Sequence, residues 1–205
     1  MADRVRIKIC GLTTPEMVEA AVDAGADAVG VVLSPSRRQV TPGRAAELLA
    51  HLPGYVAGVA VYRHPEAELV ERAMSVLPPW TLHQSDRADF TDALALARED
   101  RRVPVVRLGP TFERDIAGLD GRMVLIEGQD SGTGAPAPWH EAGPWIDRCR
   151  VVIAGGLTIQ NVGQVVRSLR PFAVDVSSGV EREPGIKDAG MVREFVAAVS
   201  EGERG

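Results

Sequence analysis

Residues 5–33 read VRIKICGLTTPEMVEAAVDAGADAVGVVL and contain one strand–helix–strand unit. The apolar runs Val5–Cys10 and Ala28–Leu33 lack polar alternation, which is typical of strands buried on both faces in a parallel sheet. Between them, Thr14 and Pro15 indicate a helix start, because a hydroxyl caps free amides and proline fits the first turn. The stretch therefore predicts a β-strand, an α-helix and a second, parallel β-strand.

The same pattern recurs along the whole chain. Further strands are expected over Val56–Tyr62, Trp80–His83, Val103–Leu108, Met123–Glu127, Val151–Ala154 and Phe172–Val176. Helices are expected over, among others, Thr14–Ala24, Pro42–Leu52, Pro65–Val76, Phe90–Arg98, Ile159–Leu169 and Ala189–Val199. Thr41 before Pro42 indicates a helix start in the same way as Thr14 before Pro15. Eight such units of about 25 residues predict an α/β protein with a single (β/α)₈ TIM barrel domain over residues 1–205. A doubly wound open sheet is the alternative that alternation alone leaves open.

Composition excludes several classes of protein. The net charge of −5 gives no electrostatic case for binding nucleic acid or an acidic membrane surface. The apolar run near the N-terminus is too short for a signal peptide, and no later stretch approaches the roughly 18 apolar residues of a membrane span. Two cysteines are too few for a secreted disulfide scaffold. We expect a cytoplasmic protein.

The first strand ends in a thiol. Lys8 and Cys10 lie on the same face of this strand, and Cys10 stands at its carboxyl end, where barrel active sites lie. A thiol there serves as nucleophile or base if neighbouring charge stabilises the thiolate. A lone cysteine is, however, more often a small apolar core residue.

Two glycine motifs follow the last two strands. Ala154–Thr158 follows strand seven and opens a helix, and Asp175–Val180 follows strand eight. Glycine lets backbone amides approach a phosphate closely, and a helix N-terminus adds a favourable dipole. Each motif alone is as readily a tight turn, but together they favour a phosphate site.

Other polar side chains are weaker candidates. Arg37 and Arg38 follow strand two and could hold a carboxylate or phosphate, although most surface arginines are only solvated. His83 is more often a structural hydrogen-bonding residue than a catalyst. The segment 131–134 after strand six could cover a ligand or be plain loop. No cluster of histidine, cysteine and carboxylate has ligand spacing, so we expect no metal.

Taken in order, these motifs resemble phosphoribosylanthranilate isomerase over essentially the whole chain. The matching stretches are Lys8–Thr13, Gly25–Gly30, Ile153–Thr158, Val174–Glu181 and Pro184–Asp188. The resemblance implies an Amadori rearrangement of N-(5-phosphoribosyl)anthranilate in tryptophan biosynthesis, with no metal or redox cofactor. An acid protonates the furanose oxygen while C1–O breaks, and a base then removes the C2 proton from the Schiff base.

The resemblance also assigns residues. Cys10 matches the general base, and Glu127 stands where the family has its aspartate acid, with Asp130 as the alternative acid. The substrate-binding set comprises Lys8, Arg38, His83, Gly155, Gly156, Asp175, Ser177, Ser178 and Gly179, of which Arg38 is at the position that contacts the anthranilate carboxylate.

Departures from the family pattern cluster near strands three, four and six. The family's Gly-Val-Phe-Val-Asn appears as Gly58–Tyr62 with Ala60 for the aromatic, and Val-Gln-Leu-His-Gly appears as Trp80–Gln84. Two alternatives follow: a paralogous isomerase of another phosphorylated ribose derivative, or a non-catalytic phosphosugar-binding barrel. The charged exterior helices, with residues such as Glu47 and Arg72, lead us to expect a monomer.

Overall fold

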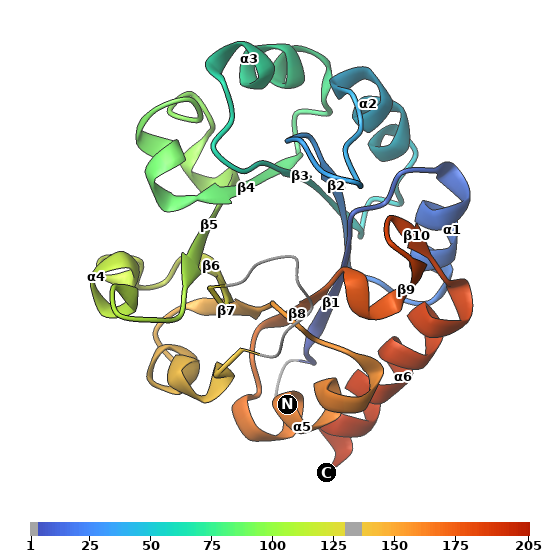
Figure 1. Cartoon of the computed structure of the whole chain (residues 1–205), viewed down its shortest axis with the longest axis vertical. Coiled ribbons are helices and arrows are strands. Elements are labelled where there is room, and N and C mark those ends of the chain that lie inside the picture. The colour runs from blue at the N-terminus through green and yellow to red at the C-terminus, as the bar shows by residue number, and fades with distance from the viewer. Residues whose placement is uncertain (1–3, 130–136) are drawn as a thin grey trace.

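A computed structural model describes residues 4–129 and 137–205, and these form a closed barrel of eight parallel strands in sequence order (Figure 1). The strands are β1 (Arg6–Cys10), β2 (Ala28–Val32), β3 (Ala57–Val61), β4 (Leu82–Asp86), β5 (Arg102–Arg107), β6 (Met123–Glu127), β7 (Arg150–Ile153) and β8 (Ala173–Val176). The predicted barrel is confirmed, because β1 pairs with both β2 and β8 and an open sheet would leave one of these edges free.

Helices form a ring outside the strands, as Figure 1 shows. They are α1 (Pro15–Asp23), α2 (Pro42–Ala50), α3 (Ala67–Val76), α4 (Phe112–Ile116), α5 (Ile159–Leu169) and α6 (Ala189–Arg204). The predicted threonine caps are present, since the side chain of Thr14 accepts a hydrogen bond from the Met17 amide and that of Thr41 from the Arg44 amide. Each bond satisfies an amide that has no partner within the helix.

The fourth unit differs from the prediction. No α-helix covers Phe90–Arg98, which lies in the described part of the chain; a 3₁₀ turn, η1 (Arg87–Thr91), is followed by irregular turns. The side chain of Asp89 accepts hydrogen bonds from the Ser85 hydroxyl and the His64 amide, which anchors the start of this segment. Such side-chain bonds compete with helical ones.

Strand four lies later in the sequence than predicted. The observed β4 covers Leu82–Asp86, whereas the run of apolar residues had placed it at Trp80–His83. Trp80 is half exposed in the preceding turn. The strand includes Gln84 and Asp86, whose polar side chains had hidden it from a search for apolar runs.

Apolar side chains pack in two layers. The larger cluster fills the space between the barrel and the helices. It includes the fully buried Ile9 of β1, Ile126 of β6 and Phe195 of α6. A smaller cluster inside the barrel includes Val105, Leu125 and others on β4 to β8. Burying each such side chain contributes about 1.5–3 kcal/mol.

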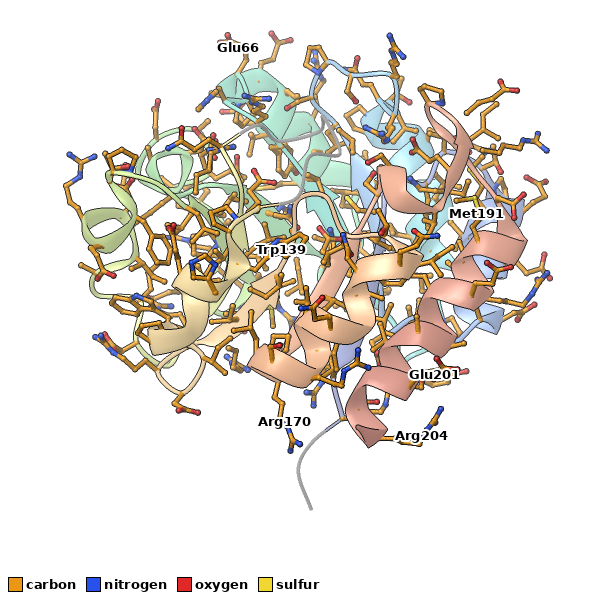
Figure 2. The ribbon with its side chains drawn as sticks, turned by 60° about the horizontal axis from the view of Figure 1, so that its bottom comes forward. Glu66, Trp139, Arg170, Met191, Glu201 and Arg204 are labelled. Carbon is orange, nitrogen blue, oxygen red and sulfur yellow. The ribbon has the colours of Figure 1, made fainter. Side chains whose placement is uncertain are left out.

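The helices run antiparallel to the strands. In Figure 2, Glu66 and Met191, near the starts of α3 and α6, lie towards one end of the molecule, while Arg170 and Arg204, at the ends of α5 and α6, lie towards the other. All strands therefore point their carboxyl ends to the face where these helices begin. Among the described residues no helix combines the length and the apolar character needed to cross a membrane.

Candidate active site

A cavity of about 310 Å³ opens at the carboxyl ends of the strands, and all eight strands or their following loops contribute to its wall. This volume lies within the range of small-molecule sites. Of the predicted site residues, the cavity is lined by Cys10, Arg38, Glu127, Gly155, Gly156, Asp175, Ser177 and Ser178. The structure thus brings together the predicted thiol, the predicted carboxyl group and both glycine loops.

Cys10 lies at the floor of this cavity, above a buried ion pair. Lys8 Nζ donates to Asp175 Oδ2 at 2.9 Å, and this ion pair links the neighbouring strands β1 and β8. Room for Cys10 and Lys8 comes from Gly30 on β2, because a Cβ there would lie 3.0 Å from Cys10 Sγ and 3.1 Å from Lys8 Cε. The thiol and the ammonium group are therefore held against each other.

The charge around Cys10 has two opposing effects. Burial raises the pKa of the Cys10 thiol, while the Lys8 ammonium opposes this shift. Burial disfavours the ammonium too, but the Asp175 carboxylate and Cys10 hold the pKa of Lys8 above its ordinary value. Lys8 thus remains charged and stabilises a thiolate at Cys10 when one forms.

The two glycine loops lie against each other. Gly155 and Gly156 have φ values of 81° and 74°, a left-handed backbone that glycine adopts without strain. A Cβ at Gly179 would lie 2.1 Å from the Leu157 carbonyl oxygen, so only glycine permits this approach. Gly179 was predicted to bind substrate, but it does not line the cavity, and its role is to permit this close approach of the two loops. Both loops line the cavity, and the loop after β7 leads into the N-terminus of α5, an arrangement suited to an anion.

Arg38 is held over the cavity by a network of ion pairs. Its Nε and Nη2 donate to the two carboxylate oxygens of Glu181 at 2.7 and 2.8 Å. Lys187 Nζ donates to Glu181 Oε1 at 2.5 Å and to the Ser177 carbonyl oxygen at 3.1 Å. The Ser177 hydroxyl in turn donates to the Cys10 carbonyl oxygen at 3.0 Å. The network therefore ties the loops after β1, β2 and β8 together.

The network sets the charge of Glu181. Burial raises the pKa of its carboxyl group, but the hydrogen bonds from Arg38 and Lys187 outweigh burial and hold that pKa at about 2. Glu181 is therefore ionised at neutral pH and keeps Arg38 in place.

Glu127 meets a second ion pair on the opposite side of the cavity. Arg107 Nη2 lies 3.2 Å from Glu127 Oε1, and Arg107 Nη1 donates to Asp86 Oδ1. Arg107, Asp86 and Gln84 also line the cavity, and sequence reasoning had assigned none of them. Alternation along β4 would have indicated Gln84 and Asp86, had the strand been extended past its apolar residues; it carries no signal for Arg107 on β5.

Besides Gly179, two predicted substrate-binding residues, His83 and Lys8, do not line the cavity. His83 faces outward from β4; its ring stacks on Tyr62, with centroids 5.9 Å apart, and its Nδ1 lies 3.3 Å from the Tyr62 hydroxyl. Burial lowers the pKa of His83 to about 4, so the ring is neutral. The prediction for His83 is corrected, because neighbours on a strand point to opposite faces and Gln84 takes the inward position. Lys8 lies below Cys10 and supports it.

The tertiary structure also gathers a group that spacing had not indicated. Ligand atoms of His64, Asp86 and Asp89 all lie within 4.8 Å of one another. They already pair among themselves, with His64 Nε2 at 3.2 Å from Asp86 Oδ2 and Nδ1 at 3.4 Å from Asp89 Oδ1. These contacts account for the cluster, and we assign it no metal. Asp130, the alternative acid, and segment 131–134 lie outside the described residues.

Comparisons with known proteins agree with this geometry. Residues 7–198 match the sequence model of the family described as N-(5'phosphoribosyl)anthranilate (PRA) isomerase. The chain is 42% identical to the N-(5'-phosphoribosyl)anthranilate isomerase of Dechloromonas aromatica (strain RCB), with 96% of each chain covered.

Solved structures of the same name share the fold. The phosphoribosyl anthranilate isomerase from Thermotoga maritima superimposes with a TM-score of 0.83 at 31% identity, covering 96% of this chain and 98% of that one. A second solved structure is a phosphoribosyl anthranilate isomerase in complex with reduced 1-(o-carboxyphenylamino)-1-deoxyribulose 5-phosphate. It superimposes with a TM-score of 0.80 at 32% identity, again covering 96% of this chain and 98% of that one.

The Arg38–Glu181–Lys187 network predicts a pH-dependent contribution to stability. The folded pKa of Glu181, about 2, lies below its ordinary value of 4.5, so its contribution is fully present above pH 4.5 and is lost as pH falls towards 2. Glu181→Gln should lower the free energy of unfolding by about 3 kcal/mol at neutral pH. Urea unfolding across this range should show the difference shrinking on acidification; a constant difference would contradict the assignment.

Proposed function

Because the chain belongs to the family of N-(5'-phosphoribosyl)anthranilate isomerases, we propose that its cavity rearranges N-(5-phosphoribosyl)anthranilate with Cys10 as general base and Glu127 as general acid. The protein is an isomerase of tryptophan biosynthesis. The observation that carries the residue roles is that this thiol and this carboxyl group line one cavity together with the two glycine loops. The relatives named above carry the name of this activity, which favours it over a paralogous isomerase or a non-catalytic phosphosugar-binding barrel.

The charges in the cavity wall suggest how the substrate lies. We place its phosphate at the loops containing Gly155, Gly156, Ser177 and Ser178, where backbone amides and the α5 N-terminus favour an anion. We place its carboxylate at Arg38, whose Nη1 is the guanidinium nitrogen that Glu181 leaves to other partners. The ribose would then span the cavity between Cys10 and Glu127. A solved relative is a complex with reduced 1-(o-carboxyphenylamino)-1-deoxyribulose 5-phosphate, a ligand that carries both a phosphate and a carboxylate.

The reaction then needs one proton donor and one acceptor. Glu127 donates its proton to the ring oxygen as the C1–O bond breaks, and the nitrogen lone pair forms the C1=N bond of a Schiff base. The Cys10 thiolate next removes the proton from C2. The C2–H electrons form the C1=C2 double bond of an enolamine while the C1=N electrons return to the nitrogen, and the enolamine tautomerises to the ketone. Oxidation at C2 is balanced by reduction at C1, so the substrate supplies its own redox partner.

Two buried polar atoms at the floor are suited to the ribose hydroxyls. Within the described residues, Gln84 Oε1 and Asp175 Oδ1 have no hydrogen-bond partner. Buried acceptors without a partner are costly, and both residues line the cavity. We assign these oxygens to hydroxyl groups of the open-chain intermediate.

The pH dependence follows from the two protonation states that are needed. The active form combines a Cys10 thiolate with a protonated Glu127, yet the pKa of Cys10 is raised above 9.0 by burial, well above the range in which carboxyl groups ordinarily titrate. The fraction of enzyme in the active form is therefore small and constant at pH values between the two pKa values. It decreases at pH values below the lower pKa and above the higher one. The acidic limb of the rate profile reports the carboxyl group, and the alkaline limb reports the thiol.

The remaining proposals concern assembly and location. We propose a monomer, because the outer helices carry many charged side chains. We propose the cytoplasm as its location because both cysteines, Cys10 and Cys149, are free thiols, as is usual in a reducing compartment. Light scattering at several concentrations tests the first, since a mass above the 21.9 kDa of one chain would contradict it.

Variants at the two proposed catalytic residues test the mechanism. Cys10→Ala and Glu127→Gln should each lower kcat by about 10²–10⁴-fold with little change in KM, because each removes one proton transfer. Turnover is followed as the loss of anthranilate-type fluorescence from freshly made substrate. If Glu127→Gln stays active and Asp130→Asn does not, the acid is Asp130.

Lys8 should determine the pH at which the rate falls on the alkaline side of the rate profile. Lys8→Gln removes the ammonium that opposes the rise in Cys10 pKa, so the alkaline limb should move to higher pH by about one unit, and kcat on the plateau should fall about tenfold. Iodoacetamide alkylation of Cys10 against pH gives a second readout of the same titration. Arg114→Gln, which removes an exposed cation, is the matched control. An alkaline limb that stays in place or moves to lower pH would refute the role of Lys8.

A further inference from the structure

The Asp86–Arg107 pair meets Glu127 at the ends of three adjacent strands. Arg107 is the last residue of β5 and pairs in register with Glu127, the last residue of β6. Asp86 is the last residue of β4 and is buried. One guanidinium nitrogen of Arg107 is hydrogen-bonded to Asp86, and the other lies 3.2 Å from Glu127.

We propose that this pair is a positioning device for Glu127: Arg107 draws its carboxyl group towards β5, and Asp86 cancels the charge of the guanidinium so that the carboxyl group holds its proton. The inference rests on the proposed role of Glu127 as the acid. Asp86 and Arg107 act through Glu127 and take no part in the proton transfers.

The first half of the device concerns length. Glu127 stands at the strand position of the family's aspartate and carries one more methylene, about 1.5 Å of additional reach. Catalysis loses about 10²-fold when a group is misplaced by about 1 Å. A lateral contact with the neighbouring strand takes up this reach, so the longer acid does not extend straight into the space of the sugar.

The second half concerns charge. A lone guanidinium 3.2 Å from a carboxyl group favours its ionised form, which is the wrong form for an acid. Asp86 hydrogen-bonds the same guanidinium, so the two side chains together carry no net charge. Glu127 thereby gains the directional contact of Arg107 while its proton is retained.

Other ionisable groups surround the pair. His64, from the loop after β3, contacts Asp86 through Nε2 and Asp89 through Nδ1. The other ionisable side chains among the described residues of the cavity wall are Cys10, Tyr62, Arg38, Arg63 and Asp175. Each of them stays unchanged in the variants used below.

Breaking the pair from either side should have opposite electrostatic effects. Asp86→Asn leaves the Arg107 charge uncompensated, so the acidic limb of the kcat profile should move to lower pH by about one unit and the plateau should fall about tenfold. Arg107→Met leaves the Asp86 charge instead, so the limb should move to higher pH. The double variant should restore the position of the limb but not the full kcat, because Glu127 is no longer held.

The opposite directions separate this role from a structural one. If the pair only stabilised the fold, both single variants would lose the same ion pair and the acidic limb would move in neither. Arg107→Lys, which keeps the charge but loses the forked contact, should lower kcat with the limb unchanged. Should Arg107→Met fail to fold, Arg107→Gln removes the same charge. Arg98→Met and Asp100→Asn, which break an exposed ion pair, serve as matched controls.

The outcomes also separate this inference from the proposed function. The positioning device alone would be overturned if Glu127→Gln is inactive but Asp86→Asn and Arg107→Met move the acidic limb of the kcat profile in the same direction or not at all. Full activity of Glu127→Gln would instead overturn the role of Glu127 as acid.

Discussion

The buried ion pair between Lys8 and Asp175 lies at the seam where the first strand meets the last. These two residues pair in register across β1 and β8, so closing the barrel brings ammonium and carboxylate together out of contact with water. A buried pair of this kind is costly if either partner is missing. Here it has a second consequence, because the same ammonium supports the Cys10 thiol at the cavity floor. Closing the barrel therefore also places the ammonium group beside Cys10, the residue that we propose as the base.

Charged side chains at the cavity wall contact side chains of opposite charge in two groups. Arg38 and Lys187 share Glu181 on one side, and Arg107 bridges Asp86 and Glu127 on the other. A chain with a net charge of −5 does not attract an anionic substrate through its overall field. Local groups must therefore supply the attraction, and the amides of the two glycine loops and the guanidinium of Arg38 are placed to do so.

The departures from the family pattern fall into two kinds once the strand faces are known. Ala60 faces outward and belongs to the packing between the barrel and its helices, so it leaves the cavity unchanged. Gln84 and Glu127 face inward and line the cavity. The inward changes are the ones that bear on chemistry, and Glu127 is accompanied by the ion pair that accommodates its greater length.

Sequence alone determined the eight-strand alternation, the caps at Thr14 and Thr41, and the expectation that Cys10, Glu127 and the two glycine loops share one end of a barrel. These features depend on local propensity and on the order of the strands, and both can be recognised from residues that are close together in the sequence. Only the tertiary structure decided which side of β4 His83 occupies, that β4 extends to Asp86, and that Arg107 reaches two other strands. Those outcomes depend on contacts between residues 20 or more positions apart, where neither spacing nor hydropathy carries a signal.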